Sequence, residues 1–404
     1  MRVLFVTWDS GDTDYLASLF FPTFAALRSR GVVVETLQMT WADETRVAAS
    51  QKAAQRLGLG YHVLRVDAAT RKTHFPLNVA RLSRELVRLA RALEVDVIMP
   101  RAIVPGLATF MARLALSGVR IAWDADGLPA DERVDFAGWS RRGLPYWGMR
   151  SVERWLLGRA DRVMVRTEHA REILMQRAHR GFDAQKIVVV PNGRDEHVYV
   201  QNKEARSSVR ANIGVSDDAP LLISVGSLGP QYLPDLQVQL IRAVFERWEG
   251  ARAVLLTAAD SVVFDALERH GVDASRVRIQ RVPASEVPRW LSAADVGLAL
   301  REGAFSQRAV SPLKVGEYLL CGLPVAATLG VGDLDRVLEP AFSYVLSTNE
   351  ASAPVLKRFV EWVGDVVLQR EAYGRVAREA GERYFGLQAM LDGYDRLLCA
   401  DDGR

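Results

Sequence analysis

The chain has 404 residues, a length that favours two domains of roughly 200 residues over a single core. Hydrophobic residues make up 49% and charged residues 25%, which is typical of a globular protein, and no apolar run reaches the ~18–20 residues that span a bilayer. The net charge of +3 divides into +7 for residues 1–200 and −4 for the remainder. This asymmetry indicates an anionic partner for the first half (lipid, nucleic acid or phosphorylated substrate) or an uneven solvated surface.

Strand-like and helix-like segments alternate through the first half of the chain. The strand-like runs are apolar throughout rather than alternating, which is typical of a parallel sheet covered on both faces. They lie at 2–8, 32–39, 61–66, 95–100, 120–125, 162–167 and 186–193, with helical patterns between them. The opening run is short and is followed by acidic residues, so we expect a buried first strand rather than a signal peptide, and a cytoplasmic protein.

The same pattern restarts near residue 220 and predicts a second doubly wound α/β domain. We expect an N-terminal domain over 1–195, a polar linker over 196–219, and a C-terminal domain over 220–384. A helix over 385–404 should pack back towards the N-terminal domain. Two such domains facing a central cleft would bind ligands at the carboxyl ends of their strands. The two cysteines and six histidines show no metal-ligand spacing, so we expect neither a disulfide scaffold nor a zinc site. No cofactor is predicted.

Basic and aromatic side chains gather in two segments of the first half. The helix predicted over 77–93 carries four arginines away from its apolar face, and residues 139–155 mix tryptophan, tyrosine and arginine. Such a surface suits contact with an anionic membrane, at the inner face of the cytoplasmic membrane, although for the helix alone we favour a solvated face.

Acidic residues follow the strand-like run 120–125 in the sequence WDADG. Asp124 and Asp126 form a D-x-D pattern, and Arg101 follows the preceding strand. A D-x-D pair can hold a metal ion, but in a doubly wound domain we favour recognition of hydroxyl groups in the cleft. Asp124 and Arg101 are therefore candidate catalytic residues, and Asp126 is a candidate substrate contact.

A glycine-flanked loop, SVGSLGP at 224–230, follows the first strand of the second domain. Gly226 and Ser227 would let a backbone approach a ligand closely. The loop lacks the G-x-G-x-x-G spacing of a dinucleotide site, so a plain tight turn is an equal alternative, and a dehydrogenase is disfavoured.

The segment 305–328 holds several groups that could bind an anion. We expect Ser311 to cap a helix that starts at Pro312 and stops at Gly322. Lys314 in the first turn opposes the helix dipole, and a phosphate would explain it. Glu317 on the same face could accept hydrogen bonds from sugar hydroxyls. The alternative is a capped surface helix with a salt bridge; Ser306 and Arg308 just upstream are further candidate anion contacts.

Ordered motifs along the chain resemble the GT-B glycosyltransferases of family GT4. The C-terminal motifs are VGSLG, VPRWLSAADVGLAL, SPLKVGEYLLCGLPV and GVGD; the N-terminal ones are PRAIVPGLA, DADGLPADERV, RADRVMVRTEHAREIL and KIVVVPNG. The resemblance implies two Rossmann-like domains, a nucleotide-sugar donor, retention of configuration and no bound metal. It also implies that Glu317 binds the ribose and that Ser311 and Lys314 meet the diphosphate.

Other positions follow from the same resemblance. Gly226 and Ser227 match the glycine loop beside the phosphates, and Arg281 and Val282 fall on the loop that contacts the base. Gly11 belongs to a Ser-Gly pair that stands where the family has Gly-Gly at the substrate.

The chain also departs from the family pattern. Ala309 replaces the earlier of two glutamates, Asp124 stands in the place of a histidine, and no basic pair follows the glycine loop. Phosphate neutralisation would then fall to Lys314 and Arg308.

The sequence therefore predicts a retaining glycosyltransferase. Its expected partners are a nucleoside diphosphate sugar, an acceptor (an envelope glycan, a lipid-linked sugar or a small natural product) and an anionic membrane, but not nucleic acid. The alternatives are a nucleotide-sugar epimerase or hydrolase on the same fold, and a catalytically inactive partner protein.

Overall fold

The computed structural model describes residues 1–10, 15–71, 73–226, 228–258, 260–347 and 350–399. By its internal contacts the chain divides into two units, Met1–Val190 together with the chain from Leu391 onward, and Pro191–Met390. The segment 196–219, expected as a linker, lies instead within the second unit and contains helix α8 (Lys203–Asn212), whose Val209 is buried. The predicted C-terminal helix is divided as well, because its first residues remain with the second unit.

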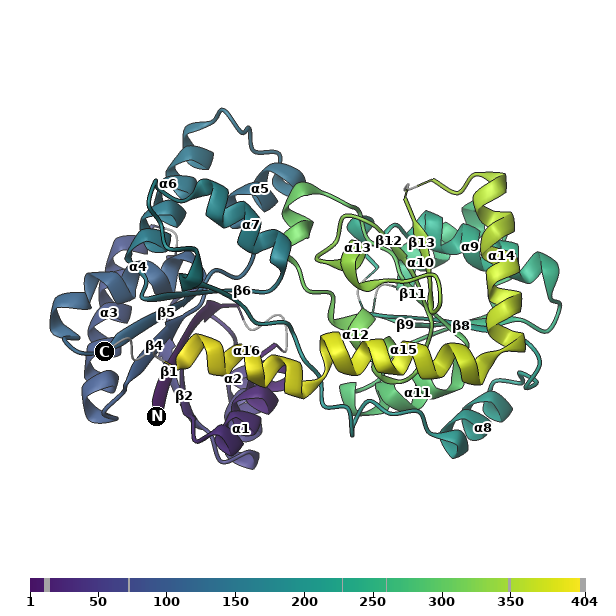
Figure 1. Cartoon of the computed structure of the whole chain (residues 1–404), viewed down its shortest axis with the longest axis horizontal. Helices are drawn as coiled ribbons and strands as arrows, with labels where there is room; N and C mark the ends of the chain where they lie inside the picture. The colour runs from purple at the N-terminus through teal and green to yellow at the C-terminus, as the bar shows by residue number, and fades with distance from the viewer. Residues whose placement is uncertain (11–14, 72, 227, 259, 348–349, 400–404) are drawn as a thin grey trace. The chain divides into compact units, whose positions relative to one another are not determined.

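The first unit is built on a parallel sheet with the strand order β3-β2-β1-β4-β5-β6-β7 (Figure 1). Its strands are β1 (Arg2–Asp9), β2 (Val33–Thr40), β3 (Gly60–Arg65), β4 (Val97–Pro100), β5 (Arg120–Asp124), β6 (Arg162–Val165) and β7 (Ile187–Val189). Its helices are α1 (Phe21–Leu27), α2 (Glu44–Arg56), α3 (Phe75–Ala92), α4 (Ile103–Met111), α5 (Pro129–Ala137), α6 (Leu144–Arg159) and α7 (Glu168–Arg177). The sheet confirms the predicted doubly wound domain.

The second unit repeats this architecture with the strand order β10-β9-β8-β11-β12-β13. Its strands are β8 (Leu221–Val225), β9 (Arg252–Leu256), β10 (Val277–Gln280), β11 (Val296–Ala299), β12 (Val325–Thr328) and β13 (Ser343–Leu346). Besides α8, its helices are α9 (Pro234–Arg247), α10 (Asp260–Arg269), α11 (Val287–Ala293), α12 (Leu313–Leu320), α13 (Leu334–Val337), α14 (Ala353–Leu368) and α15 (Arg370–Phe385). Helix α16 (Leu387–Leu398) leaves this unit and ends in the first.

Both faces of the second sheet are buried, as its apolar strands predicted. Along β8, Leu221 and Ile223 belong to one hydrophobic core, whereas Leu222 between them belongs to another. Because successive side chains point to opposite faces of a sheet, each face has a core of its own. No described helix combines the length and the apolar character that crossing a bilayer requires.

Each sheet has a point at which the strand order reverses direction, and ligands of such folds bind beside it at the carboxyl ends of the strands. In the first unit this point lies between β1 and β4, and Arg101 follows β4 directly. In the second unit it lies between β8 and β11, so Gly226 and Arg301 follow the two strands that flank it.

Candidate functional site

The start of α12 differs in detail from the prediction. The helix begins at Leu313 with Pro312 as its N-cap, and no side chain caps it. Ser311 was wrongly expected to cap this helix: its Oγ accepts a hydrogen bond from the Asn192 N–H at 3.4 Å, and its carbonyl accepts one from Asn192 Nδ2 at 3.2 Å. A segment far away in sequence therefore uses the polar atoms of Ser311. The predicted stop at Gly322 is confirmed by its left-handed φ of +63°.

Two cations share one aromatic ring next to this helix start. The Lys314 Nζ lies 4.8 Å from the centre of the Tyr232 ring, and the guanidinium carbon of Arg301 lies 5.2 Å from the same centre. Within the described part of the chain neither cation forms an ion pair, and the Arg301 Nε is buried without a hydrogen-bond acceptor. Unneutralised cations in close proximity favour an anion between or beside them.

The electrostatics of Lys314 reflect this arrangement. Burial, reinforced by the charge of Arg301, lowers the pKa of Lys314 from 10.5 to about 8, and the charge of Glu317 opposes the change only partly. The ammonium form is therefore held in an unfavourable environment. A bound phosphate would relieve it, so the site is poised for an anionic ligand.

Arg301 was not predicted from the sequence, although its position is informative. It is the second residue after β11 and thus lies at the reversal point of the second sheet. Its N–H donates to Thr328 Oγ1 at 2.9 Å, which fixes the backbone at the end of β12. The signal that could have found it is a charged residue immediately behind an apolar central strand.

The glycine loop after β8 has the geometry expected for close approach of a ligand. Gly226 has φ +99°, donates its N–H to the Leu256 carbonyl at 2.9 Å, and a Cβ there would meet open space. The loop is tied to α12, since the Val225 N–H donates to the Tyr318 hydroxyl at 2.8 Å. Ser227 lies outside the described residues, as does Gly11 of the first unit.

Glu317 is buried and already has two polar partners. Its Oε1 accepts hydrogen bonds from Arg194 Nε at 2.9 Å and from the Tyr199 hydroxyl at 3.1 Å. Burial raises the pKa of Tyr199, and the adjacent Glu317 raises it further, so the phenol remains a hydrogen-bond donor. Neither partner was predicted. Together they fix the carboxylate one turn after Lys314.

The remaining predicted residues of the second unit lie in more peripheral positions. Ser306 is buried in the 3₁₀ turn Phe305–Ala309, whereas Arg308 is exposed and lies 5.8 Å from the centre of the Phe305 ring. After β10, Arg281 is exposed and Val282 packs against the core. The structure therefore places Lys314 and Arg301 at one ring, and Arg308 stays a predicted phosphate contact.

In the first unit, the three predicted residues around the D-x-D pattern come together, with one arginine added. Arg101 Nη2 binds Asp126 Oδ1 at 2.7 Å, and Arg166 Nη2 binds Asp124 Oδ2 at 2.7 Å. Burial raises the pKa of Asp126 to about 6 against the opposing charge of Arg101. Arg166 follows β6 and was not predicted; its guanidinium donates a hydrogen bond to the Tyr394 hydroxyl of α16.

Each aspartate is thus engaged by an arginine, and the described residues contain no cluster of three or more potential metal ligands. Both aspartates of the D-x-D pattern therefore form ion pairs with arginines in this structure.

The backbone is strained at Ala102, which follows Arg101 and hydrogen-bonds to Asp124. Ala102, the N-cap of α4, has φ +64° and ψ −165°, a conformation that is essentially restricted to glycine. Its N–H donates to the Asp124 carbonyl at 2.8 Å, and its carbonyl accepts from Trp123 Nε1 at 3.0 Å. Strain of this kind persists where the surroundings hold it, as at binding sites.

Comparison with known proteins identifies related sequences and folds. Residues 24–198 match the family model described as Glycosyltransferase Family 4. The chain is 27% identical over 268 residues to a D-inositol 3-phosphate glycosyltransferase of Geodermatophilus obscurus, a match that covers 61% of this chain and 54% of that protein. The chain thus spans about half the length of this curated relative.

Solved structures extend the likeness to almost the whole chain. The Anabaena protein HepE in complex with UDP and glucose superposes with a TM-score of 0.70 at 17% identity, over 98% of this chain and 99% of that one. A glycosyltransferase of Rickettsia africae gives a TM-score of 0.73 at 11% identity, over 98% of both chains. The family model thus covers residues 24–198, and the solved structures show that almost the whole chain has the same fold of two Rossmann-like domains as HepE and the Rickettsia africae glycosyltransferase.

Proposed function

We propose that this protein transfers a sugar from a nucleoside diphosphate sugar to a hydroxyl group of an acceptor, with retention of configuration and without a metal ion. The observation that carries the proposal is the pair formed by Lys314 and Arg301 across the Tyr232 ring, beside the strand reversal of the second sheet. It is supported by the glycosyltransferase names of the relative and of the Rickettsia africae structure, and by the UDP and glucose named with HepE.

In this proposal the second unit stabilises the leaving group. Negative charge accumulates on the diphosphate as the bond to the sugar breaks, and fixed cations lower the energy of that state. Lys314 and Arg301 supply these cations, and the loop at Gly226 lets the phosphates approach the backbone. Glu317, held by Arg194 and Tyr199, accepts hydrogen bonds from the ribose hydroxyls.

The first unit binds the sugar or the acceptor in this proposal. Asp126 and Arg101 form a partly exposed ion pair, with side-chain exposures of 32% and 20%, and can exchange hydrogen bonds with hydroxyl groups. Asp124 is fully buried and held by Arg166, so it acts by positioning this pair. The acceptor attacks on the face that the diphosphate leaves, and the departing phosphate oxygen takes up the acceptor's proton.

The acceptor is proposed to be presented at an anionic membrane. Leu144 and Trp147 of α6 are 87% and 58% exposed, and Leu114 is 98% exposed. Arg91 of α3 donates to the carbonyl of Ala115, the residue after Leu114. Arg150 and Arg154 belong to the same helix as Leu144 and Trp147. Sedimentation with vesicles of phosphatidylcholine, with and without ~30% phosphatidylglycerol, tests this contact. Loss of binding in Leu144→Ser/Trp147→Ser supports it, and equal binding to both vesicle types contradicts it.

The decisive experiment separates donor binding from transfer. The unfolding temperature is measured with UDP, GDP, ADP and TDP sugars, because a ligand that binds only the folded state raises it. The stabilising donor is then incubated, labelled in its sugar, with and without candidate acceptors. Sugar transfer in the wild type and its loss in Lys314→Ala are expected; turnover at the wild-type rate in a folded Lys314→Ala would refute the assignment.

The same experiment addresses the alternatives. A putative UDP-N-acetylglucosamine 2-epimerase of Listeria monocytogenes superposes with a TM-score of 0.60 at 14% identity, which supports the epimerase as an alternative on this fold. An epimerase or a hydrolase converts the donor without an acceptor. An inactive partner protein binds no donor, or binds one without turnover.

A further inference from the structure

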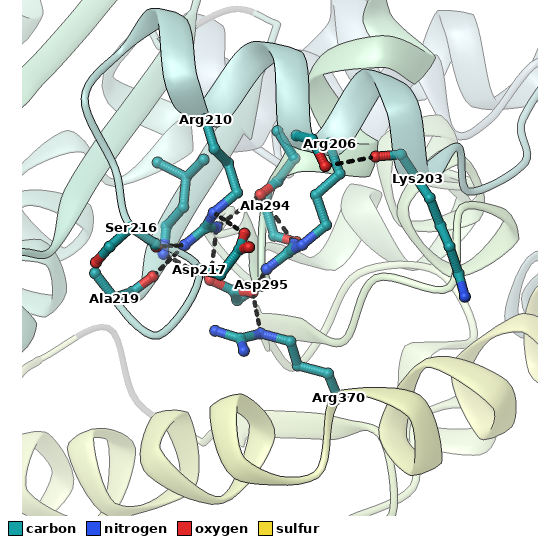
Figure 2. Close-up of polar contacts among 12 residues, drawn as sticks. Lys203, Arg206, Arg210, Ser216, Asp217, Ala219, Ala294, Asp295 and Arg370 are labelled. Atoms are coloured by element: carbon teal, nitrogen blue, oxygen red, sulfur yellow. Dashed lines mark hydrogen bonds and ion pairs between the residues drawn. The ribbon is translucent and has the colours of Figure 1, made fainter.

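A buried carboxylate in the second unit is surrounded by three arginines (Figure 2). Asp295 has no exposed side-chain surface. Its carboxylate binds Arg206 Nη2 at 2.8 Å, Arg210 Nη1 at 3.2 Å and Arg370 Nε at 2.7 Å. The arginines come from the first turn of α8, from further along α8, and from the start of α15. The cluster ties these elements to the beginning of β11.

The cluster contains more positive charge than its carboxylate neutralises. Although burial opposes ionisation, the three guanidinium groups hold the pKa of Asp295 below its ordinary value, so one negative charge faces three positive ones. Asp217 adds little, because it is 84% exposed and lies 3.7 Å from Arg210. The Arg370 Nη2 is moreover buried without a hydrogen-bond acceptor. The cluster therefore has an excess of positive charge. Backbone carbonyls accept hydrogen bonds from the other two arginines, and the exposed Asp218 lies near Arg370, but none of these groups is a second buried carboxylate.

A pocket of about 580 Å³ opens beside the cluster, and it is strongly basic. Arg206 and Arg370 line it, together with Lys203, Arg375 and Arg378. Five of its fourteen lining residues are cationic, and only Asp217 and Glu371 are acidic. A pocket of this size accommodates a small metabolite.

The first residues of two helices line the same pocket. Lys203 is the first residue of α8, and Arg370 is the first residue of α15. Cations in the first turn oppose the helix dipole, which favours negative charge there. A helix start combined with arginine donors is a recognised arrangement for phosphate. Each helix start also carries one carboxylate, Glu204 in α8 and Glu371 in α15, so an anion in the pocket would complement the remaining cations.

We propose that this pocket binds a small phosphorylated metabolite through its phosphate group. A phosphate dianion matches the excess positive charge, and its oxygens can accept hydrogen bonds from Lys203 and Arg375, the two exposed cations of the pocket. The site is separate from the donor site proposed above: Gly322, just beyond the end of α12, lines the pocket, whereas Lys314 lies in the first turn of that helix. The inference does not rest on the proposed transferase activity.

Inorganic phosphate is the probe that tests this site. The unfolding temperature of the full chain is followed against phosphate concentration at constant ionic strength, with chloride as the balancing anion. A saturable rise is expected in the wild type and also in Lys314→Ala, in which the donor site is impaired. In Lys203→Ala/Arg375→Ala the half-saturating concentration should increase about tenfold or more, as expected for lost charge-assisted contacts.

Two double variants serve as controls. Lys52→Ala/Arg56→Ala removes the same residue types from exposed positions of α2 and should respond like the wild type. Lys203→Arg/Arg375→Lys keeps both charges in the pocket and should retain the response. The proposal is overturned if the wild type shows no saturable rise, if Lys203→Ala/Arg375→Ala responds like the wild type, or if Lys314→Ala abolishes the whole response.

Discussion

Replacing Lys314 with methionine should stabilise the fold while it removes function. Methionine keeps the length of the side-chain stem and carries no charge. The fall in the pKa of Lys314 from 10.5 to about 8 means that its charged form is less favourable in the native state than in the unfolded chain. Each tenfold change in proton affinity corresponds to about 1.4 kcal/mol, so the free energy of unfolding should rise by up to about 3 kcal/mol at pH 7.

The pH dependence makes this prediction specific. Between pH 8 and 10.5 the unfolded chain binds more protons at Lys314 than the native one, so wild-type stability gains from rising pH across this window. The advantage of Lys314→Met should therefore shrink to about 1 kcal/mol at pH 10. Urea unfolding at pH 7 and pH 10 measures both values. The reasoning would be refuted if Lys314→Met were less stable than the wild type at pH 7, or if its gain in unfolding free energy were the same at pH 7 and pH 10.

Although Lys314→Met should raise the free energy of unfolding, it should lower the rate of catalysis. Loss of one fixed charge opposite the developing negative charge typically costs about 10²–10³ in kcat. The wild-type kcat/KM should fall above pH 8, because it reports the ionisation of the free enzyme. Lys314→Arg, which stays charged, should lack this alkaline limb.

Three further substitutions test separate features. Arg301→Gln should shift the alkaline limb of kcat/KM to higher pH, because the charge of Arg301 helps to lower the pKa of Lys314. The same variant should weaken donor binding about tenfold. An alkaline limb at the wild-type pH would contradict the interaction between Arg301 and Lys314. Burial raises the pKa of Asp126 to about 6, so native protein binds extra protons between pH 4 and 6 and loses stability as pH rises through that range. Asp126→Asn should flatten this fall in urea midpoints taken at pH 4.5 and 6.5, and an unchanged slope contradicts it. Gly297→Ala should cost about 1–3 kcal/mol of unfolding free energy, since its Cβ would lie 2.3 Å from the Tyr318 ring; an unchanged midpoint would mean that the ring moves freely.

The sequence predicted the architecture well because strands that are apolar throughout indicate a sheet that is buried on both faces. It also predicted Lys314, Glu317 and Asp126 as polar residues near strand ends or a helix start. It could not predict partners that the fold brings from afar: Arg194 reaches Glu317 across 123 positions. The prediction that Ser311 caps the helix was wrong for the same reason. Local propensity carries no information about Asn192, a distant residue that hydrogen-bonds to Ser311 instead.

Arg301 was missed for a different reason. The local pattern indicates phosphate-binding cations only around the helix at 312–321. The end of β11 lies next to β8 because of the strand order, which is a property of topology rather than of local pattern. Similarly, the linker expected at 196–219 was inferred from polarity. Arginines such as Arg210, only 1% exposed, are polar in sequence and yet buried through their ion pairs.

The chain leaves the first unit after Val190 and returns to it at Leu391, and this has a consequence for folding during biosynthesis. The first unit includes the end of α16, where Tyr394 is buried and hydrogen-bonds to Arg166, the partner of Asp124. Because synthesis proceeds from the N-terminus, the second unit can complete its sheet on the ribosome while the first still lacks this helix. The first unit then closes last, so the polar cluster at Asp124 is among the final parts of the molecule to be assembled.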